Sequence, residues 1–115
     1  MMTTYWFPSE AGDGYNPVEA DDADVTWIDV HCKACGAAST RRLARFVQLH
    51  EGGPVGIKPF TVDGQPRGPW FKVAGNVIRF RLKCSRGHDT NCTVAEAADL
   101  LAARRRGALP TRVAR

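Results

Sequence analysis

The sequence predicts one small α+β domain built from antiparallel β-hairpins, with a single metal site and a C-terminal helix. Three observations support this prediction. Short runs rich in β-branched and aromatic residues alternate with Gly and Pro turns. One segment near the end of the chain carries a helix-capping signal, and two cysteine-containing turns lie far apart. A chain of 115 residues buries a modest core, to which a metal cross-link would add stability.

The two cysteine-containing turns have the composition of a metal site. The first reads HCKACG over residues 31–36, and the second reads KCSRGH over residues 83–88. Two intervening residues allow both sulfurs of a Cys-x-x-Cys pair to face one ion, and zinc prefers four thiolate or imidazole ligands in a tetrahedron. We therefore predict one structural zinc ion that ties residues 32–35 to residues 84–88, with the ligands Cys32, Cys35, Cys84 and His88.

The fourth ligand has an alternative in Cys92. The predicted helix begins after Thr93, so Cys92 occupies the position where a small hydrophobic staple could pack on Ala97. His88 lies in the turn beside Cys84 and is favoured over Cys92 as the ligand. His31 is expected to be a surface or half-buried histidine, because adjacent strand residues point to opposite faces and Cys32 follows it directly. His50 is a weaker candidate.

Two other interpretations of the cysteines are a redox dithiol and unliganded buried thiols. A redox Cys-x-x-Cys pair belongs at a strand-to-helix junction within a βαβ pattern, which the sequence lacks. The N-terminus has no basic and apolar regions of a signal peptide, and no apolar run is long enough to span a bilayer. We expect a cytoplasmic protein with reduced cysteines, which favours a metal over a disulfide.

The first part of the chain is predicted to be an arm. An aromatic cluster, YWFP at residues 5–8, is expected to pack on the domain. Residues 9–24 are rich in Gly, Asp, Glu, Asn and Pro, which is typical of an extended or disordered linker. The predicted organisation is an acidic arm over residues 1–24, the domain over residues 25–107 and a loose basic tail over residues 108–115.

The strands of the domain follow from composition and turns. Residues 25–31 form a strand that enters the first cysteine turn, whereas residues 39–51 fit a helix or a strand. Residues 55–62 read as an edge strand, because Pro59 cannot donate to a ladder. Residues 70–74 and 77–83 flank Gly75-Asn76, which predicts a hairpin.

The last regular element is a helix over residues 94–106. Thr93 and Glu96 have the spacing of a capping box, and Gly107 is suited to the C-terminal stop. The packing stripe is expected to consist of Val94, Ala97, Ala98 and Leu101.

Charge is divided unevenly along the chain. Residues 1–29 contain seven acidic residues and no Lys or Arg, whereas residues 30–115 contain 16 basic residues and five acidic ones, a net charge of +11. Such a division favours a basic surface that binds a polyanion, although an arm that only neutralises its own domain gives the same pattern. The candidate nucleic-acid contacts are Arg41, Arg42, Arg45, Arg79, Arg81, Lys83, Arg86, Arg104, Arg105 and Arg106.

The two turns and the strand-rich segment between them resemble a zinc ribbon. The resemblance covers residues 25–92, with CKACG at 32–36 and FRLKCSRGH at 80–88. It implies a structural zinc between two hairpin knuckles, a strand after the first knuckle, and binding to DNA, RNA, polymerase or ribosome surfaces. The Cys-x3-His pair and the long insert depart from the usual pattern, and a helix after the second pair also resembles the order of a treble clef.

Two functions follow as expectations. The first is a zinc-stabilised module that binds nucleic acid or a nucleoprotein machine in transcription or translation, with no membrane or small-molecule partner. The second is a protein-binding adaptor that uses its acidic and aromatic arm, residues 1–24. We do not expect an enzyme, because a catalytic zinc needs an open position and a carboxylate base, and Asp89 is the only acid beside a knuckle.

Overall fold

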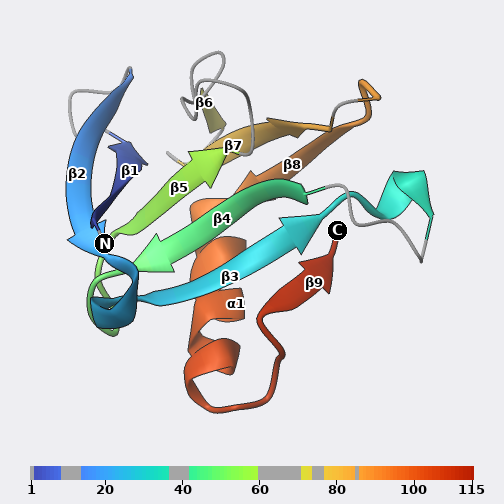
Figure 1. The fold of residues 1–115 in the computed structure, drawn as a ribbon. Coiled ribbons are helices and arrows are strands. Elements are labelled where there is room, and N and C mark those ends of the chain that lie inside the picture. The colour runs from blue at the N-terminus through green and yellow to red at the C-terminus, as the bar shows by residue number, and fades with distance from the viewer. Residues whose placement is uncertain (1, 9–13, 37–41, 60–70, 74–76, 85) are drawn as a thin grey trace.

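The computed structural model describes residues 2–8, 14–36, 42–59, 71–73, 77–84 and 86–115, and these form two β-sheets and one α-helix. The larger sheet has the strand order β2-β1-β5-β4-β3-β9 (Figure 1). Its strands are β1 (Met2–Pro8), β2 (Tyr15–Asp21), β3 (Thr26–His31), β4 (Arg42–Gln48), β5 (Val55–Pro59) and β9 (Arg112–Ala114). The smaller sheet contains β6 (Phe71–Val73), β7 (Val77–Lys83) and β8 (Asp89–Thr93), and the helix α1 covers Val94–Arg105. The chain is a small α+β protein, as the sequence predicted.

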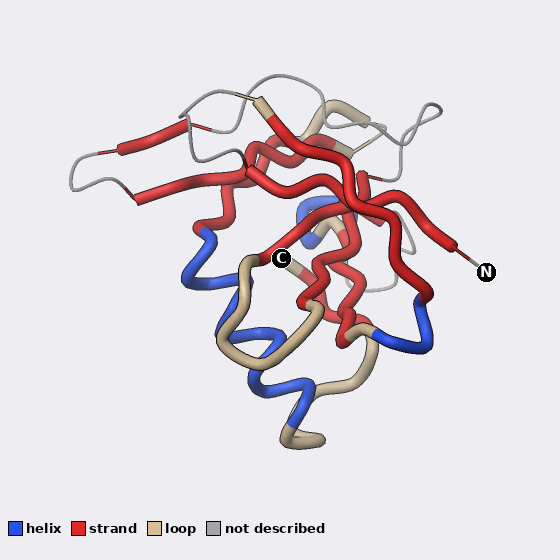
Figure 2. The backbone as a smooth tube through the Cα atoms, turned by 90° about the vertical axis from the view of Figure 1, so that its left-hand side faces the viewer, coloured by secondary structure: helices blue, strands red, loops and turns tan. Residues whose placement is uncertain are grey.

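The hydrophobic core lies between the two sheets and α1. The large sheet contributes Ile28, Val30, Phe46 and Ile57, the small sheet contributes Phe80 and Leu82, and α1 contributes Ala97 and Leu101. The rings of Phe46 and Phe80 lie 5.8 Å apart between centroids, so this pair joins the two sheets directly. Figure 2 shows the β6–β7 hairpin on the opposite side of the molecule from β1 and β2.

The helix α1 begins where the sequence predicted. The Thr93 hydroxyl accepts a hydrogen bond from the Glu96 amide at 2.9 Å, and the Glu96 carboxylate accepts one from the Thr93 amide at 3.0 Å. The capping box is therefore complete. Ala97 and Leu101 are fully buried, and Val94, Ala98 and Leu100 pack against the core.

The N-terminal segment differs from the predicted linker. Strands β1 and β2 form a hairpin with a continuous register from Met2↔Asp21 to Pro8↔Tyr15, and β1 joins β5 at Trp6↔Ile57. Tyr5 is fully buried and Trp6 packs against the core, so the prediction of aromatic packing is confirmed. Residues 15–21, with the acidic Glu19 and Asp21 and with Pro17, form a strand because an outer strand needs few apolar side chains and tolerates proline.

Two further segments also differ from the predictions. Strand β5 was predicted to be an edge strand, but it lies between β1 and β4. Pro59 is tolerated there because it is the last residue of the strand. The tail predicted to be loose contains β9, which pairs in parallel with β3. An ion pair between Arg115 and Glu96 and backbone hydrogen bonds from Arg115 to His31 and from Lys33 to Arg115 hold this strand.

Strand pairing shows which structure residues 42–48 adopt, and it adds a third strand to the hairpin predicted at residues 70–83. Residues 42–48 form β4, paired with β3 and β5, so the strand interpretation is confirmed for these residues. Strands β6 and β7 pair as predicted, while their turn at residues 74–76 lies outside the described residues. Strand β8 was not predicted, because Asp89–Thr93 contains one apolar residue, Cys92, and therefore shows no alternation of polar and apolar side chains. Among the described residues, no helix is long and apolar enough to cross a membrane.

Candidate metal centre

Two turns, each at the end of a strand in a different sheet, form the candidate metal centre. Strand β3 leads into Cys32 and the short 3-10 helix Lys33–Cys35, and β7 leads into Cys84, from which the chain returns as β8. Gly36 and Gly87 have φ angles of +106° and +87°, a left-handed conformation that favours glycine. Backbone hydrogen bonds from Gly36 to the Lys33 carbonyl and from Gly87 to the Cys84 carbonyl close the turns at 3.0 and 2.9 Å.

The four predicted zinc ligands come together between these turns. One ligand atom from each of Cys32, Cys35, Cys84 and His88 lies within 4.8 Å of every other. The Sγ atoms of Cys35 and Cys84 are 3.7 Å apart. The Nδ1 atom of His88 lies 3.2, 3.4 and 3.7 Å from the sulfurs of Cys35, Cys84 and Cys32. Residues separated by about half the chain therefore share one small volume.

These distances match the edges of a tetrahedral zinc site. Zinc–sulfur bonds of about 2.3 Å place two sulfurs about 3.8 Å apart, and a zinc–nitrogen bond of about 2.0 Å places sulfur and nitrogen about 3.5 Å apart. The observed sulfur–sulfur distance of 3.7 Å agrees with the first value. A disulfide would bring the sulfurs to about 2.0 Å, and all four cysteines are free.

The local environment shifts the pKa values of two clustered thiols, Cys84 and Cys35, in opposite directions. Burial would raise the pKa of Cys84, but backbone hydrogen bonds from His88 and Arg86 outweigh it, so its pKa is lowered. Burial and the neighbouring sulfurs of Cys32 and Cys84 raise the pKa of Cys35. Close thiols resist sharing more than one negative charge, and a bound divalent cation removes that repulsion because it binds thiolates.

Cys92 lies apart from this cluster. Its side chain is fully buried in the core, where its Sγ contacts the Thr93 carbonyl at 3.6 Å. Burial raises the pKa of this thiol to about 11, so it remains protonated at neutral pH. Cys92 belongs to the hydrophobic core together with Ala97, as expected for a residue that packs before a helix.

The other histidines also lie outside the cluster. His31 is buried, with only 6% of its surface exposed, which corrects the prediction of a surface or half-buried residue. Its strand, β3, is paired on both sides, with β4 and β9. His50 is exposed in the turn after β4.

The predicted nucleic-acid contacts divide into paired and exposed arginines. Arg45 is engaged by Asp29, with Nε–Oδ1 and Nη2–Oδ2 distances of 2.7 and 3.2 Å, and its guanidinium lies 3.9 Å from the centroid of Trp27. Arg42 has a longer ion pair of 4.0 Å to Asp29. Besides Arg42, the exposed members are Arg86, Arg105 and Arg106, whereas Arg79 and Arg104 are half-buried. Arg41 and the side chains of Arg81 and Lys83 lie outside the described parts of the chain.

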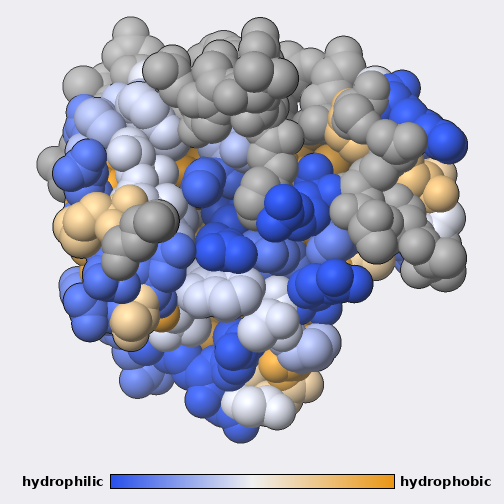
Figure 3. Space-filling model, in the orientation of Figure 1, coloured by the Kyte–Doolittle hydropathy of each residue, from blue (hydrophilic) through white to orange (hydrophobic). Residues whose placement is uncertain are grey.

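The network that engages Arg45 was not predicted from the sequence. The Tyr5 hydroxyl donates a hydrogen bond to Asp22 at 2.5 Å, and Asp22 lies 3.8 Å from Arg45. This network lies on the face of the large sheet turned away from the core, because Ile28 and Val30 alternate with Trp27 and Asp29 along β3. The surface in front of β3 and β4 is largely hydrophilic (Figure 3). The sequence indicated this network only through Asp29 and Arg45, because each is a single charged residue between two apolar residues of a strand.

Comparison with known proteins identifies no relative. No protein-family model matches the chain, no curated protein matches it, and no solved structure matches it.

Proposed function

We propose that the protein is a binding module whose fold is held by one structural zinc ion, ligated by Cys32, Cys35, Cys84 and His88. The observation that carries the proposal is the cluster of these four ligand atoms within 4.8 Å. Four protein ligands fill a tetrahedral shell and leave no open position for substrate, which is typical of a structural site and supports a non-catalytic role. The arrangement of two knuckles at strand ends resembles a zinc ribbon. A treble clef is the alternative, because α1 follows the second knuckle after only one strand, β8.

The zinc proposal has a direct test. Protein purified without added metal should contain one zinc per chain by elemental analysis. Removal of that zinc with a chelator should lower the melting temperature, because a metal that binds only the folded state adds its binding free energy to stability. Protein that contains no zinc, takes up none and melts at the same temperature with and without chelator would contradict the proposal.

We also propose that the module binds nucleic acid or a nucleoprotein surface. Support comes from the exposed cations that have no carboxylate partner among the described residues: Lys33 and Arg86 on the knuckles, Arg105 and Arg106 at the end of α1, and Arg112 on β9. A net charge of +11 over residues 30–115 supports the same proposal. Phosphate contacts of this kind bind nucleic acids with little sequence preference.

A mobility-shift assay at two salt concentrations tests nucleic-acid binding. We expect affinity for an arbitrary single-stranded oligonucleotide to fall steeply between 50 and 200 mM salt, because each phosphate contact releases counterions. Arg86→Gln should weaken binding several-fold and flatten the salt dependence, whereas Arg86→Lys should retain most of the affinity. Binding that is absent at low salt would contradict the proposal.

Protein binding through the N-terminal hairpin is the second candidate function. Strand β2 is the outer strand of the large sheet among the described residues, and Glu19 on it is exposed. An outer strand with free backbone groups can accept an extended peptide, and its acidic side chains favour a basic one. Partner binding that persists in high salt and is lost on deletion of residues 1–24 would favour this candidate over nucleic acid.

A further inference from the structure

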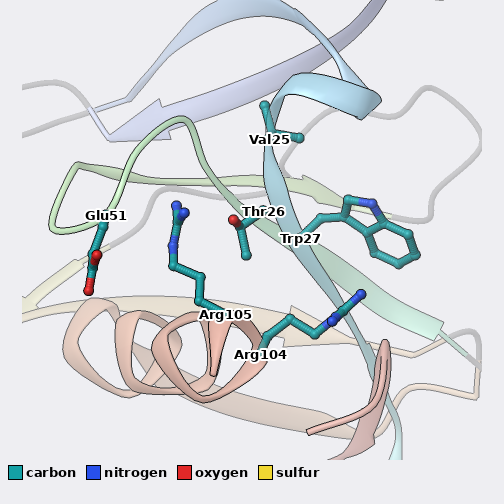
Figure 4. A pocket seen from close by; sticks show the side chains of 6 residues that line it. All are labelled: Val25, Thr26, Trp27, Glu51, Arg104 and Arg105. Carbon is teal, nitrogen blue, oxygen red and sulfur yellow. The ribbon is translucent and has the colours of Figure 1, made fainter. Parts of the chain in front are cut away.

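Cationic side chains lie near both ends of β3. At its start, an open pocket between β3 and α1 is lined by Val25, Thr26, Trp27, Glu51, Arg104 and Arg105 (Figure 4). The Trp27 ring points to the opposite side of β3 from Thr26, and the guanidinium of Arg45 lies 3.9 Å from its centroid. Glu51 adds a carboxylate to the lining, so the pocket does not select one class of ligand. At the end of β3, the knuckles hold a hydrogen-bond donor with a defined direction.

That donor belongs to His88, which turns its Nδ1 atom toward the cysteine cluster. Nδ1 lies 3.2, 3.4 and 3.7 Å from the sulfurs of Cys35, Cys84 and Cys32. Backbone hydrogen bonds from Gly87 to the Cys84 carbonyl and from Cys84 to the His88 carbonyl hold the His88 backbone close to the cluster. Nδ1 is the ring nitrogen nearer to the backbone, so a zinc ion in this cluster would bind His88 through Nδ1.

The other ring nitrogen of His88, Nε2, faces away from the cluster. The two nitrogens flank one ring carbon, so a ring that directs Nδ1 at an ion directs Nε2 elsewhere. When Nδ1 binds a metal, the neutral ring carries its proton on Nε2 and donates from there. Within the described residues Nε2 has no hydrogen bond, and it is not one of the buried polar atoms that lack a partner. The half-buried His88 therefore presents this donor to solvent.

The charges on the knuckles favour an anionic acceptor for this donor. A metal-bound histidine usually donates its second N–H to a carboxylate, a carbonyl or water. Zinc with three thiolates and one neutral imidazole has a net charge of −1, to which the exposed Lys33 and Arg86 add +2. Lys83 and Asp89, which pair across β7 and β8, have opposite charges that cancel. The resulting net charge of +1 matches one phosphate of a nucleic-acid strand.

We propose that His88 donates a hydrogen bond from Nε2 to a phosphate of a nucleic-acid strand, beside Arg86 of the same turn. The inference rests on the proposed zinc site and nucleic-acid function, and it identifies a zinc ligand that also contacts the partner. His88 would then have two roles, because ligation through Nδ1 fixes both the ring and the proton that the phosphate oxygen accepts. Free inorganic phosphate has the same chemistry, and the test separates it from a strand.

Long-range proton–nitrogen NMR spectra of the full zinc-loaded chain test the state of the His88 ring. We expect Nδ1 to have the chemical shift of a metal-bound nitrogen and Nε2 to carry a proton. An arbitrary single-stranded oligonucleotide should shift the Nε2–H signal and slow its exchange with water, whereas inorganic phosphate at the same phosphate concentration should not. Zinc on Nε2 with a proton on Nδ1 would overturn the inference and leave the zinc site standing.

The variant His88→Cys separates the donor from the metal ligand, because a fourth thiolate can hold zinc but has no Nε2–H. Elemental analysis should show one zinc per chain. We expect the affinity for the oligonucleotide to fall about fivefold at 200 mM salt, which is the effect of one hydrogen bond.

The control for charge is Lys33→Gln, because the fourth thiolate in His88→Cys also lowers the charge of the knuckles by one. Lys33 is exposed on the other knuckle and is not a metal ligand. Lys33→Gln should weaken binding at 50 mM salt and have a smaller effect at 200 mM, because the contribution of a cation arises from counterion release. The effect of His88→Cys should persist at 200 mM.

The remaining outcomes separate this inference from the proposed function. If zinc-loaded His88→Cys binds no more weakly than Lys33→Gln at 200 mM salt, the phosphate contact is overturned and nucleic-acid binding stands. If His88→Cys holds no zinc, the response of the wild-type Nε2–H signal to the oligonucleotide decides the inference. A signal that only inorganic phosphate shifts overturns the strand as the partner of His88. Absence of oligonucleotide binding at low salt overturns the nucleic-acid function and this inference together.

Discussion

The beginning and the end of β3 are secured by different chemistry. At its end, Cys32 and Cys35 meet Cys84 and His88 in a cluster of soft ligands. Just before its beginning, Asp22 connects Tyr5 of the N-terminal hairpin to Arg45 on β4. The first connection would be completed by the proposed ion, which requires reduced thiols, whereas the second is complete within the protein but depends on protonation states.

The proposed zinc would make one part of the fold depend on metal. A structural zinc contributes an apparent free energy of about 10–16 kcal/mol in small zinc modules, whereas breaking a buried ion pair costs about 3–5 kcal/mol. The cluster joins the two sheets, because Cys32 follows β3 and Cys84 follows β7. The network joins only strands and a turn of the large sheet. Loss of zinc should therefore separate the sheets, and loss of the network should loosen the hairpin.

The largest expected effect is that of Cys84→Ser. This variant should lose its zinc and most of its stability, because serine is a poor zinc ligand. Elemental analysis and thermal unfolding in the presence of zinc provide the measurements. The control is Cys92→Ser, the same substitution in the core, which should retain one zinc and lose only about 1–3 kcal/mol. Equal zinc loss in both variants would contradict the assignment of Cys84, and not Cys92, to the metal site.

The second effect is that of Arg45→Met on the network. Its substitution leaves the Asp29 carboxylate buried, with 7% of its side chain exposed, and without its closest cation. We expect a loss of about 3 kcal/mol in urea denaturation, with zinc content unchanged. Adding Asp29→Asn to Arg45→Met should recover part of the loss, because no uncompensated charge is then buried. A double variant less stable than the single one would contradict this explanation.

The third effect is a pH dependence assigned to Tyr5. Burial, and then its hydrogen bond to Asp22, raise the Tyr5 pKa from 10.0 to about 12, so its contribution is present below pH 10 and is lost as pH rises to about 12. This change is worth up to about 2–3 kcal/mol. The hydrogen bond from Tyr5 lowers the pKa of Asp22, whose contribution is present above its ordinary pKa near 3.8 and is lost in more acidic solution. Tyr5→Phe should reduce both dependences in pH-resolved unfolding, and unchanged profiles would contradict the assignment.

The smallest effect is expected for Arg42→Ala. Arg42 lies 4.0 Å from Asp29 and its side chain is 47% exposed, so water screens the pair. We expect a loss of less than about 1 kcal/mol by urea denaturation. A loss equal to that of Arg45→Met would mean that Asp29 depends on both arginines.

The cluster of candidate metal ligands was predictable because its chemistry is local to two turns. Cys-x-x-Cys at residues 32–35 and Cys84 with His88 each specify a turn, and the structure brings the two turns together as predicted. The capping box of α1 was predictable for the same reason, since Thr93 and Glu96 form it without any tertiary contact.

The N-terminal hairpin and β9 were not predictable from local pattern. Residues 15–21 lack a strand-like run of apolar residues, and they form a strand because they pair with the neighbouring strand, which Tyr5 and Trp6 fix. The tail forms β9 because the free edge of β3 and the carboxylate of Glu96 are available to it. The engagement of Arg45 also depends on tertiary structure, since the sequence places Asp22 and Asp29 far from it.

X-ray absorption at the zinc edge of the purified protein tests the central claim most directly. We expect one zinc per chain, with three sulfur ligands at about 2.3 Å and one nitrogen ligand at about 2.0–2.1 Å. The cluster of Cys32, Cys35, Cys84 and His88 supplies that set. A spectrum with four sulfur ligands, with mainly oxygen ligands, or from a protein that holds no zinc would contradict it.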